Sequence, residues 1–442
     1  MLAVLRQRNA ALLWSAGLIS VLGDWLLLLG LPYYVYALSG SVLATGAALA
    51  AGTLPRILVA PAAGVFVDRW DRRRTMIAAD VARALLLLPL LAVRSADALW
   101  LVYVVQFVEQ ATGQFFTPAK RALVPRLVPR QHLAAANALD ELALGAGRLL
   151  GPPLGGALLG LLGFESVVLL DAGSFLVSAV LLASIAVEPA AAQSHQLGLR
   201  SQGSQSGAVR SPSSPRPGSG WPATRARRCT LWCSAGSVWP AVWREWLAGL
   251  RLLRGQRVLV TLFGLKALVM VAYGIVFVLL VVFVRDVRGG GPLELAWFTT
   301  AQGLGTVLGS AVAGRLGRAV APGRLFAAGL AAVGIGFVAT FNAPALPLAL
   351  ASILVAGAGL VGSAVGERTL LQTRVADAYR GRAFATYDTG GAGLMLVGQG
   401  VAAVLGPAAG VAAALDVAGA LYLAAAVGAH ALLPRVREPS EE

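Results

Sequence analysis

Charged residues are scarce in this 442-residue chain: Asp, Glu, Lys and Arg make up 13% of it, whereas a soluble globular domain carries roughly 25%. Hydrophobic residues reach 57%, and the mean hydropathy is +0.73. This number of charged residues is too small to cover the surface of a soluble protein of this size. The composition therefore argues against an ordinary soluble protein and predicts an integral membrane protein.

Cysteine, histidine and lysine are also rare, and each shortage removes a class of function. Cys229 and Cys233 are the only cysteines, which excludes a disulfide framework; we expect free thiols, because further metal ligands are missing nearby. The three histidines lack metal-ligand spacing, and there is no G-x-S-x-G nucleophile motif. Neither lysine follows a phosphate-binding G-x-x-x-x-G run. We therefore expect no enzyme, no metal and no cofactor, and no activity driven by nucleotide hydrolysis.

What the chain has in abundance is long apolar runs. A helix needs about 20 residues to cross a hydrocarbon core of roughly 30 Å. Twelve runs of about this length can be marked, six in each half of the chain, so the predicted fold is all-α with twelve transmembrane helices in two six-helix bundles. The runs are 10–38, 42–66, 75–93, 98–117, 134–163, 166–187, 258–284, 294–314, 325–343, 346–366, 383–405 and 408–432.

A segment of different composition, residues 188–243, separates the two halves. It is rich in Ser, Pro, Gly, Gln and Arg and contains too little apolar surface to order itself, so we expect a flexible linker between bundles 1–187 and 244–442. Five of the ten tryptophans lie between Trp221 and Trp246, among arginines. This mixture suits the headgroup region of a membrane and does not call for a nucleic-acid partner.

The distribution of basic residues predicts the topology. Of the 36 Lys and Arg residues, only three fall in loops on the side opposite the termini, namely Arg94, Arg285 and Arg288. Four lie within spans: Arg56, Arg83, Arg148 and Lys266. The remainder lie on the side of the termini, so the positive-inside rule places both termini in the cytoplasm. The net charge of +15 then reports orientation and not an acidic partner.

The segment Gly147 to Gly156 reads GRLLGPPLGG and places glycines at helical spacing within an apolar run. Glycines four residues apart allow a second backbone to approach closely, and proline removes a backbone donor and loosens the helix. On spacing alone, a simple packing seam explains the segment as well as a functional motif does.

The two halves also share a pattern. Gly64 lies in the loop that follows the second span of the first half, and Gly314 lies 250 positions later, after the second span of the second half. Basic residues follow both glycines. Two six-helix halves in parallel arrangement with a cytoplasmic linker are the layout of a secondary transporter, whose substrate site lies between the halves.

The loop from Gly64 to Arg74 resembles the motif between helices 2 and 3 of the major facilitator superfamily. The resemblance implies a cytoplasmic gate, with Asp68 meeting the start of the eleventh helix near Arg382. A carboxylate there would gain from the helix dipole. The residues assigned to this gate are Gly64, Asp68, Arg69, Arg72 and Arg73.

The glycine-rich segment is similar to the antiporter motif in helix 5 of the same superfamily, carried here by Gly147, Gly151, Pro152, Gly155 and Gly156. This resemblance implies an exporter of drugs or metabolites. The phrases LGDW at 22–25 and FTPAKRALVP at 116–125 resemble the branch that contains enterobactin exporters and macrolide efflux proteins. The expected function is export of a small amphipathic or hydrophobic molecule by proton antiport, in a bacterial inner membrane, by a monomer.

One departure concerns the proton route. Exporters of the family often carry an arginine in helix 4, whereas this chain has Gln106 there. Asp24 and Glu109 are the proton-coupling candidates, since ionisable groups inside a span normally serve function. The structural alternative is that they neutralise one of the four cations within the spans.

Two of those cations, Arg148 and Lys266, are candidates for binding substrate or for forming charge pairs. Asp171 is expected near the outer end of its span. Asp416 is a minor coupling candidate, deep in the last span.

Two other functions stay open on the sequence alone. One is a membrane sensor or scaffold that binds a partner through the Trp/Arg-rich linker. The other is a proton-coupled uptake transporter. Deleting residues 195–235 distinguishes the first from an exporter, and the direction of substrate movement distinguishes the second.

Overall fold

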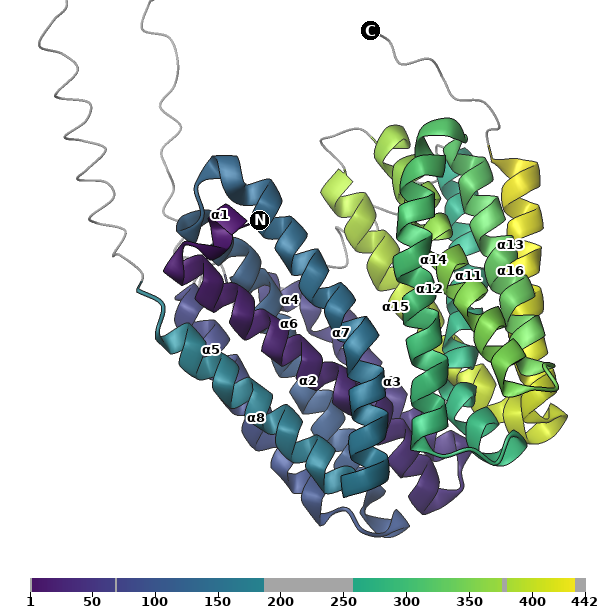
Figure 1. Ribbon diagram of the computed structural model, residues 1–442, viewed down its shortest axis with the longest axis horizontal. Coiled ribbons are helices and arrows are strands. Elements are labelled where there is room, and N and C mark those ends of the chain that lie inside the picture. Colours follow the sequence, from purple (N-terminus) through teal and green to yellow (C-terminus); the bar gives the residue numbers. More distant parts are fainter. Residues whose placement is uncertain (1, 68–69, 187–256, 376–379, 434–442) are drawn as a thin grey trace, which may run out of the picture.

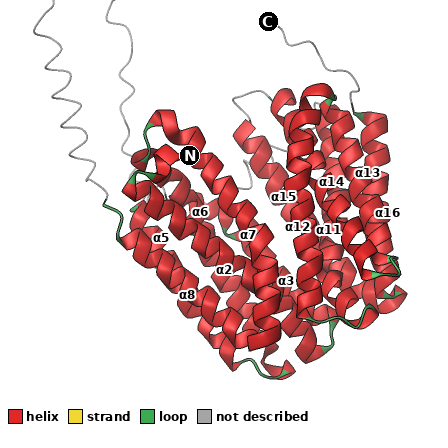
Figure 2. Ribbon diagram, viewed as in Figure 1, coloured by secondary structure: helices red, strands yellow, loops and turns green. Residues whose placement is uncertain are grey.

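The computed structural model describes residues 2–67, 70–186, 257–375 and 380–433. Within these ranges the chain is helical and contains no strand (Figure 2). The predicted linker 188–243, both cysteines, Asp68 and Arg69 lie outside the described residues. The all-α membrane fold predicted from the apolar runs is confirmed.

The first bundle holds the six predicted spans of the N-terminal half, the second of which is divided in two. The division follows Leu58 because Pro61 has no N–H to donate to the carbonyl of Ile57. The helices are α1 (Leu2–Leu5), α2 (Arg8–Ser39), α3 (Val42–Leu58), α4 (Ala60–Val67), α5 (Arg72–Leu87), α6 (Leu99–Leu127), α7 (Leu133–Leu162) and α8 (Phe164–Ala183).

The second bundle contains the other six, and its first helix ends in a π-helical turn, Phe283–Val287. Among the described helices, ten are long and apolar enough to cross a membrane; α6 and α12 fall short, the former because it carries polar groups that form part of the site below. The helices are α11 (Arg257–Val282), α12 (Pro292–Ala319), α13 (Pro322–Phe341), α14 (Leu346–Arg374), α15 (Arg380–Ala409) and α16 (Val411–Leu432).

The outer surface of both bundles is apolar. Leu161 is 83% exposed, and Val404 and Val427 are each 69% exposed. Exposure of so large an apolar area to water would be unfavourable, whereas contact of these side chains with lipid is favourable. Inside the second bundle, small residues let helices approach closely: a Cβ added to Gly329 of α13 would lie 2.3 Å from the backbone nitrogen of Ser363 on α14. The fold therefore combines a lipid-facing exterior with helix seams of small residues.

The two bundles meet chiefly through two pairs of helices, α3 with α15 and α7 with α12, with smaller contacts of α11 with α2 and α3 and of α12 with α2. They contact each other near one end and diverge toward the end at which the N- and C-termini lie (Figure 1). The contacts between bundles involve the early part of α3 and the late part of α15, as in the approach of Gly46 to Gln399 and Ala403. The arrangement is a two-bundle body that is closed at the end remote from its termini.

Candidate functional site: a buried charge cluster in the first bundle

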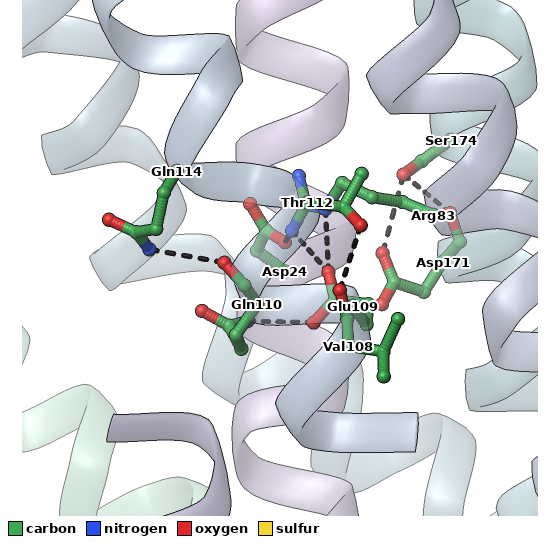
Figure 3. Close-up of polar contacts among 9 residues, drawn as sticks. All are labelled: Asp24, Arg83, Val108, Glu109, Gln110, Thr112, Gln114, Asp171 and Ser174. Atoms are coloured by element: carbon green, nitrogen blue, oxygen red, sulfur yellow. Dashed lines mark hydrogen bonds and ion pairs between the residues drawn. The ribbon is translucent and has the colours of Figure 1, made fainter. Parts of the chain in front are cut away.

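Arg83 on α5 is the centre of a charge cluster inside the first bundle (Figure 3). Its Nε donates to Oε1 of Glu109 on α6 at 2.6 Å, and its Nη2 donates to Oδ1 of Asp24 on α2 at 2.6 Å. The guanidinium also lies over the ring of Phe175, 3.9 Å from the ring centre. Gln110 donates to the second oxygen of Glu109 at 2.9 Å. Both predicted proton-coupling residues therefore bind the same arginine.

Two more carboxyl groups belong to this cluster. Asp80 lies one turn before Arg83 on α5, is fully buried, and accepts a hydrogen bond from Ser178 at 2.6 Å. Asp171 on α8 is 1% exposed and lies beside Gly23, where an added Cβ would come 2.5 Å from its Oδ1. Asp171 was expected near the outer end of its span. That expectation was wrong: the contact between α2 and α8 brings Asp171 level with the residue before Asp24.

The members of the cluster differ in their exposure to solvent. The side chain of Asp24 is 37% exposed, whereas those of Arg83 and Glu109 are 7% and 2% exposed. Asp24 thus joins the buried members to a more accessible surface. Sequence reasoning missed Asp80 because its span was read for apolar length, although the spacing Asp80 to Arg83 is one helical turn.

The position at which the superfamily resemblance expects an arginine, Gln106, is 8% exposed, and its Oε1 has no hydrogen-bond partner among the described residues. Arg83 comes from the neighbouring helix and binds Glu109, one turn along α6 from Gln106. The first bundle therefore contains the expected cation, but it comes from the third span and not from the fourth.

The glycines of the predicted antiporter motif lie at two tight contacts of α7. Within the first bundle, a Cβ at Gly151 would lie 2.3 Å from Cβ of Trp25, and one at Gly155 would lie 3.2 Å from the backbone of Leu26. Gly147 faces the same Trp25 ring. Toward the second bundle, a Cβ at Gly156 would lie 2.3 Å from Cβ of Ala296 on α12. Helix α7 therefore packs closely against a neighbouring helix on both of its faces.

Pro152 and Pro153 affect the same contact. Proline has no N–H, so Pro152 leaves the carbonyl of Arg148 without its helical donor. A Cβ at Gly303 of α12 would lie 3.0 Å from that carbonyl oxygen. The freed carbonyl therefore lies at the contact between the two bundles. The functional role assigned to these residues stays a prediction.

Lys266 and Arg148, the two candidates for substrate binding or charge pairing, differ in their surroundings. Lys266 on α11 donates to Glu367 on α14 at 3.1 Å and lies 4.7 Å from the ring centre of Tyr387. The Tyr387 hydroxyl donates to the same carboxylate. Arg148 is exposed and makes no ion pair with a described residue. The contacts of Lys266 favour a charge pair.

The predicted cytoplasmic gate is only partly described. Gly64 lies within α4, whereas Asp68 and Arg69 lie outside the described residues. Arg73 instead donates to the carbonyls of Leu182, at 2.8 Å, and Ala183, so it caps the last turn of α8 in its own bundle. For Arg72 no contact across the bundles is found among the described residues. Asp71 caps α5 by accepting from the backbone nitrogen of Arg74 at 2.8 Å.

At the closed end, a contact that the sequence did not indicate joins the bundles. The hydroxyl of Tyr36, in the last turn of α2, donates to Asp286 in the π-helical turn after α11. The guanidinium of Arg285 lies 5.5 Å from the centre of the Tyr36 ring. Deeper in, Gln399 donates to Thr53 at 3.4 Å. In the last span, Asp416 accepts from Asn342 at the end of α13, close to the membrane boundary and not deep within it.

A profile for the Major Facilitator Superfamily matches residues 13–293, which is more than half of the chain. The chain belongs to the Major Facilitator Superfamily. This membership agrees with the prediction that the chain is not an enzyme, since the family consists of transport proteins.

Curated relatives match the chain over less than half of its length. An uncharacterized MFS-type transporter of Bacillus subtilis, YfiS, is 32% identical over 177 residues, 40% of this chain and 42% of that protein. Macrolide efflux protein A of Streptococcus pyogenes is 25% identical over 40% of this chain and 44% of its own. Multidrug efflux pump Tap of Mycolicibacterium fortuitum is 29% identical over 41% and 46%.

Solved structures resemble the whole chain at low identity. The nucleoside transporter NupG is 12% identical, with a TM-score of 0.70 over 96% of this chain and 98% of its own. A bacterial homologue of the iron transporter ferroportin is 16% identical; its inward-facing structure has a TM-score of 0.69 over 97% and 99%. Its outward-facing structure has a TM-score of 0.54 over 96% and 98%. These similarities support the fold.

Proposed function

We propose that the protein is a secondary transporter that exports a small amphipathic or hydrophobic molecule by proton antiport and alternating access. It would act in a bacterial inner membrane with both termini in the cytoplasm, as a monomer and without a cofactor. The efflux proteins among its relatives and the glycine-rich segment on α7 support export. The excess of Lys and Arg on the side of the termini supports the orientation.

The observation that carries proton coupling is the ratio of charges in the cluster. One guanidinium faces four carboxyl groups, three of them almost fully buried: Asp80, Glu109 and Asp171. Several uncompensated negative charges in a low-dielectric interior would be very unfavourable. A cluster of this composition balances its charge by binding protons, and Asp24 offers a contact with water through which protons can exchange. We assign the proton site to this cluster.

The arrangement of the bundles supports an inward-facing state. With cytoplasmic termini, the bundles diverge on the cytoplasmic side and meet on the outer side, where Tyr36 contacts Asp286 (Figure 1). The higher TM-score against the inward-facing ferroportin homologue than against its outward-facing structure supports the same reading. In this state a molecule from the cytoplasm or the inner leaflet enters between the bundles.

Export and coupling are tested together in proteoliposomes of known orientation, with a panel of dyes, macrolides and siderophores and an imposed proton gradient. We expect gradient-driven movement out of the cytoplasmic side in the wild type. Asp24→Asn and Glu109→Gln should each abolish the dependence on the gradient, because each removes a carboxyl bound to Arg83. The matched control is Asp416→Asn, a carboxyl in the other bundle that accepts a hydrogen bond from Asn342.

Three outcomes would contradict the proposal. Movement toward the cytoplasmic side with the protons would establish uptake. Undiminished gradient dependence in both cluster variants would remove the proton site from the cluster. If the intact chain moves no compound, and deleting residues 195–235 removes the function of the protein, the sensor or scaffold that binds a partner through the linker is favoured.

A further inference from the structure

Two arginines within the membrane spans differ from the other intramembrane cations of the described chain. Arg83 and Lys266 each have a carboxylate oxygen within 3.1 Å. Arg56 on α3 and Arg148 on α7 are exposed, and neither makes a hydrogen bond or ion pair through its side chain with a described residue. Unpaired cations at membrane depth are unfavourable and normally face a polar cavity or a ligand.

Both arginines lie at the meeting of the two bundles. Arg56 lies one turn from Thr53, which accepts from Gln399 of α15. Ile57, the residue after Arg56, lies 4.0 Å from the position of a Cβ added to Gly393, which is also on α15. The backbone carbonyl of Arg148 faces Gly303 of α12, as described above. Each arginine is therefore carried on the helix through which the first bundle contacts the second.

Tyr273 of α11, in the opposite bundle, lies near the same contact and is half-buried. A Cβ added to its neighbour Gly274 would lie 2.9 Å from the backbone nitrogen of Gln399, which donates to Thr53 one turn from Arg56. The electrostatic interaction of its phenol with both Arg56 and Arg148 agrees with this placement. Arg148 lies at the midpoint of the 30-residue α7, and Arg56 lies near the midpoint of the span that α3 and α4 form together, so both are well inside a hydrocarbon core of roughly 30 Å. Two positive charges and a hydroxyl thus share the middle of the membrane.

An apolar surface adjoins these polar groups. The ring of Tyr273 stacks on that of Phe277 one turn along α11, with ring centres 5.8 Å apart. A guanidinium binds carboxylate, sulfonate or phosphate through two parallel N–H bonds. Charge and aromatic surface side by side fit a molecule that is acidic at one end and apolar at the other.

We propose that Arg56 and Arg148 bind the acidic group of the transported molecule, so that the substrate class is an amphipathic anion. Tyr273 would donate its hydroxyl to the same group, and the Tyr273–Phe277 pair would hold the apolar part. This inference rests on the proposed function, because it takes the surface between the bundles as the substrate path. It differs from a cation-selective drug exporter, for which two unpaired arginines would repel the substrate.

The test compares two fluorescent probes that differ in charge: anilinonaphthalene sulfonate, an anion, and its uncharged analogue phenylnaphthylamine. Binding to the full chain is titrated in nanodiscs of phosphatidylcholine, with empty nanodiscs subtracted. We expect the anion to bind at least about tenfold more tightly than the neutral probe. Arg56→Gln and Arg148→Gln should each weaken anion binding about tenfold and leave phenylnaphthylamine binding unchanged, which also shows that the variants fold.

Charge and position are controlled separately. Arg148→Lys should retain most of the preference for the anion, and Arg94→Gln, at an exposed position in the loop between α5 and α6, should behave as wild type. Equal binding of the two probes, or anion binding that neither glutamine variant reduces, would overturn the inference. Repeating the titration with phosphatidylglycerol in the nanodisc separates two sources of the anion: competition indicates a lipid headgroup, and its absence a soluble molecule.

The result also separates this inference from the proposed function. Selective anion binding without gradient-driven movement in proteoliposomes would leave the site standing and overturn proton antiport. Gradient-driven movement of an uncharged or cationic compound, unaffected by Arg56→Gln and Arg148→Gln, would leave antiport standing and overturn the anion site.

Discussion

At the scale of single residues, Arg83 holds the cluster together, because it is the cation shared by Asp24 and Glu109. Its removal would leave buried carboxyls without a partner. Breaking a buried ion pair by removing one partner costs about 3–5 kcal/mol. Arg83→Gln should therefore lower the thermal unfolding temperature in detergent markedly and abolish proton-driven transport.

Arg83→Lys keeps the positive charge but cannot reproduce the hydrogen bonds that the guanidinium donates to Glu109 and Asp24. Compared with Arg83→Gln, we expect it to restore stability more fully than transport. Arg94→Gln serves as the control, since Arg94 is exposed and lies outside the cluster. Unfolding of Arg83→Gln at the wild-type temperature would show that the cluster does not depend on its arginine.

The residue scale is also where sequence reasoning was weakest. Asp24 and Glu109 were selected because each is an ionisable group within a span, and that rule is local. Asp80 and Asp171 join them only through the packing of α5 and α8 against α2 and α6, which periodicity cannot show. The same limit hid the difference between Lys266, which meets Glu367, and Arg148, which meets no described carboxylate. A partner more than 100 positions away leaves no local pattern.

At the scale of secondary-structure elements, α7 combines a helix seam and a contact between bundles. Gly156→Val should drive the bundles apart at their closed end, because an added Cβ would lie 2.3 Å from Ala296 and 2.8 Å from the carbonyl of Pro292. We expect transport to fall at least about tenfold. A cysteine at Thr53 should also react faster with an impermeant maleimide added outside, in a chain carrying Cys229→Ser and Cys233→Ser.

Gly160→Val is the matched control on the same helix, since a Cβ there has no atom within 4 Å. If both valine variants label and transport alike, the contact at Gly156 does not hold the outer side closed. The helices themselves were predicted well: each of the twelve apolar runs corresponds to a helix or a pair of helices. Ten of these helices are long and apolar enough to cross a membrane by composition alone, and α6 and α12 are the two that are not. The break between α3 and α4 and the π-helical turn at Phe283–Val287 were not predicted, as they depend on backbone hydrogen bonds.

At the scale of the whole molecule, alternating access requires α3 and α15 to separate at the outer end. An added Cβ on Gly46 would lie 3.8 Å from Cβ of Ala403, which is the mean separation found in disulfides. In the background without native cysteines, Gly46→Cys with Ala403→Cys should cross-link readily under oxidation. The cross-link should block transport until a reductant is added.

Each single-cysteine variant is the control for oxidation alone, and should transport at the same rate with or without oxidant. A double variant that is fully cross-linked yet transports at the wild-type rate would show that this pair of helices does not part during the cycle. The two-bundle layout was predictable from the repeated pattern of spans, whereas the closed end was not, since it follows from which residues of one bundle meet glycines of the other, such as Ala403 at Gly46 and Ala296 at Gly156.

The polar contacts at that closed end have an energetic consequence. Hydrogen bonds between side chains in membrane proteins contribute on average about 0.6 kcal/mol each. Tyr36 with Asp286 and Gln399 with Thr53 would together contribute little more than 1 kcal/mol at that average. Moving one elementary charge through a membrane potential of 100 mV releases about 2.3 kcal/mol. A single proton moved across the resting voltage of a cell by the proposed antiport would therefore supply enough energy to release both bonds, and the balance between the two states would then be sensitive to voltage.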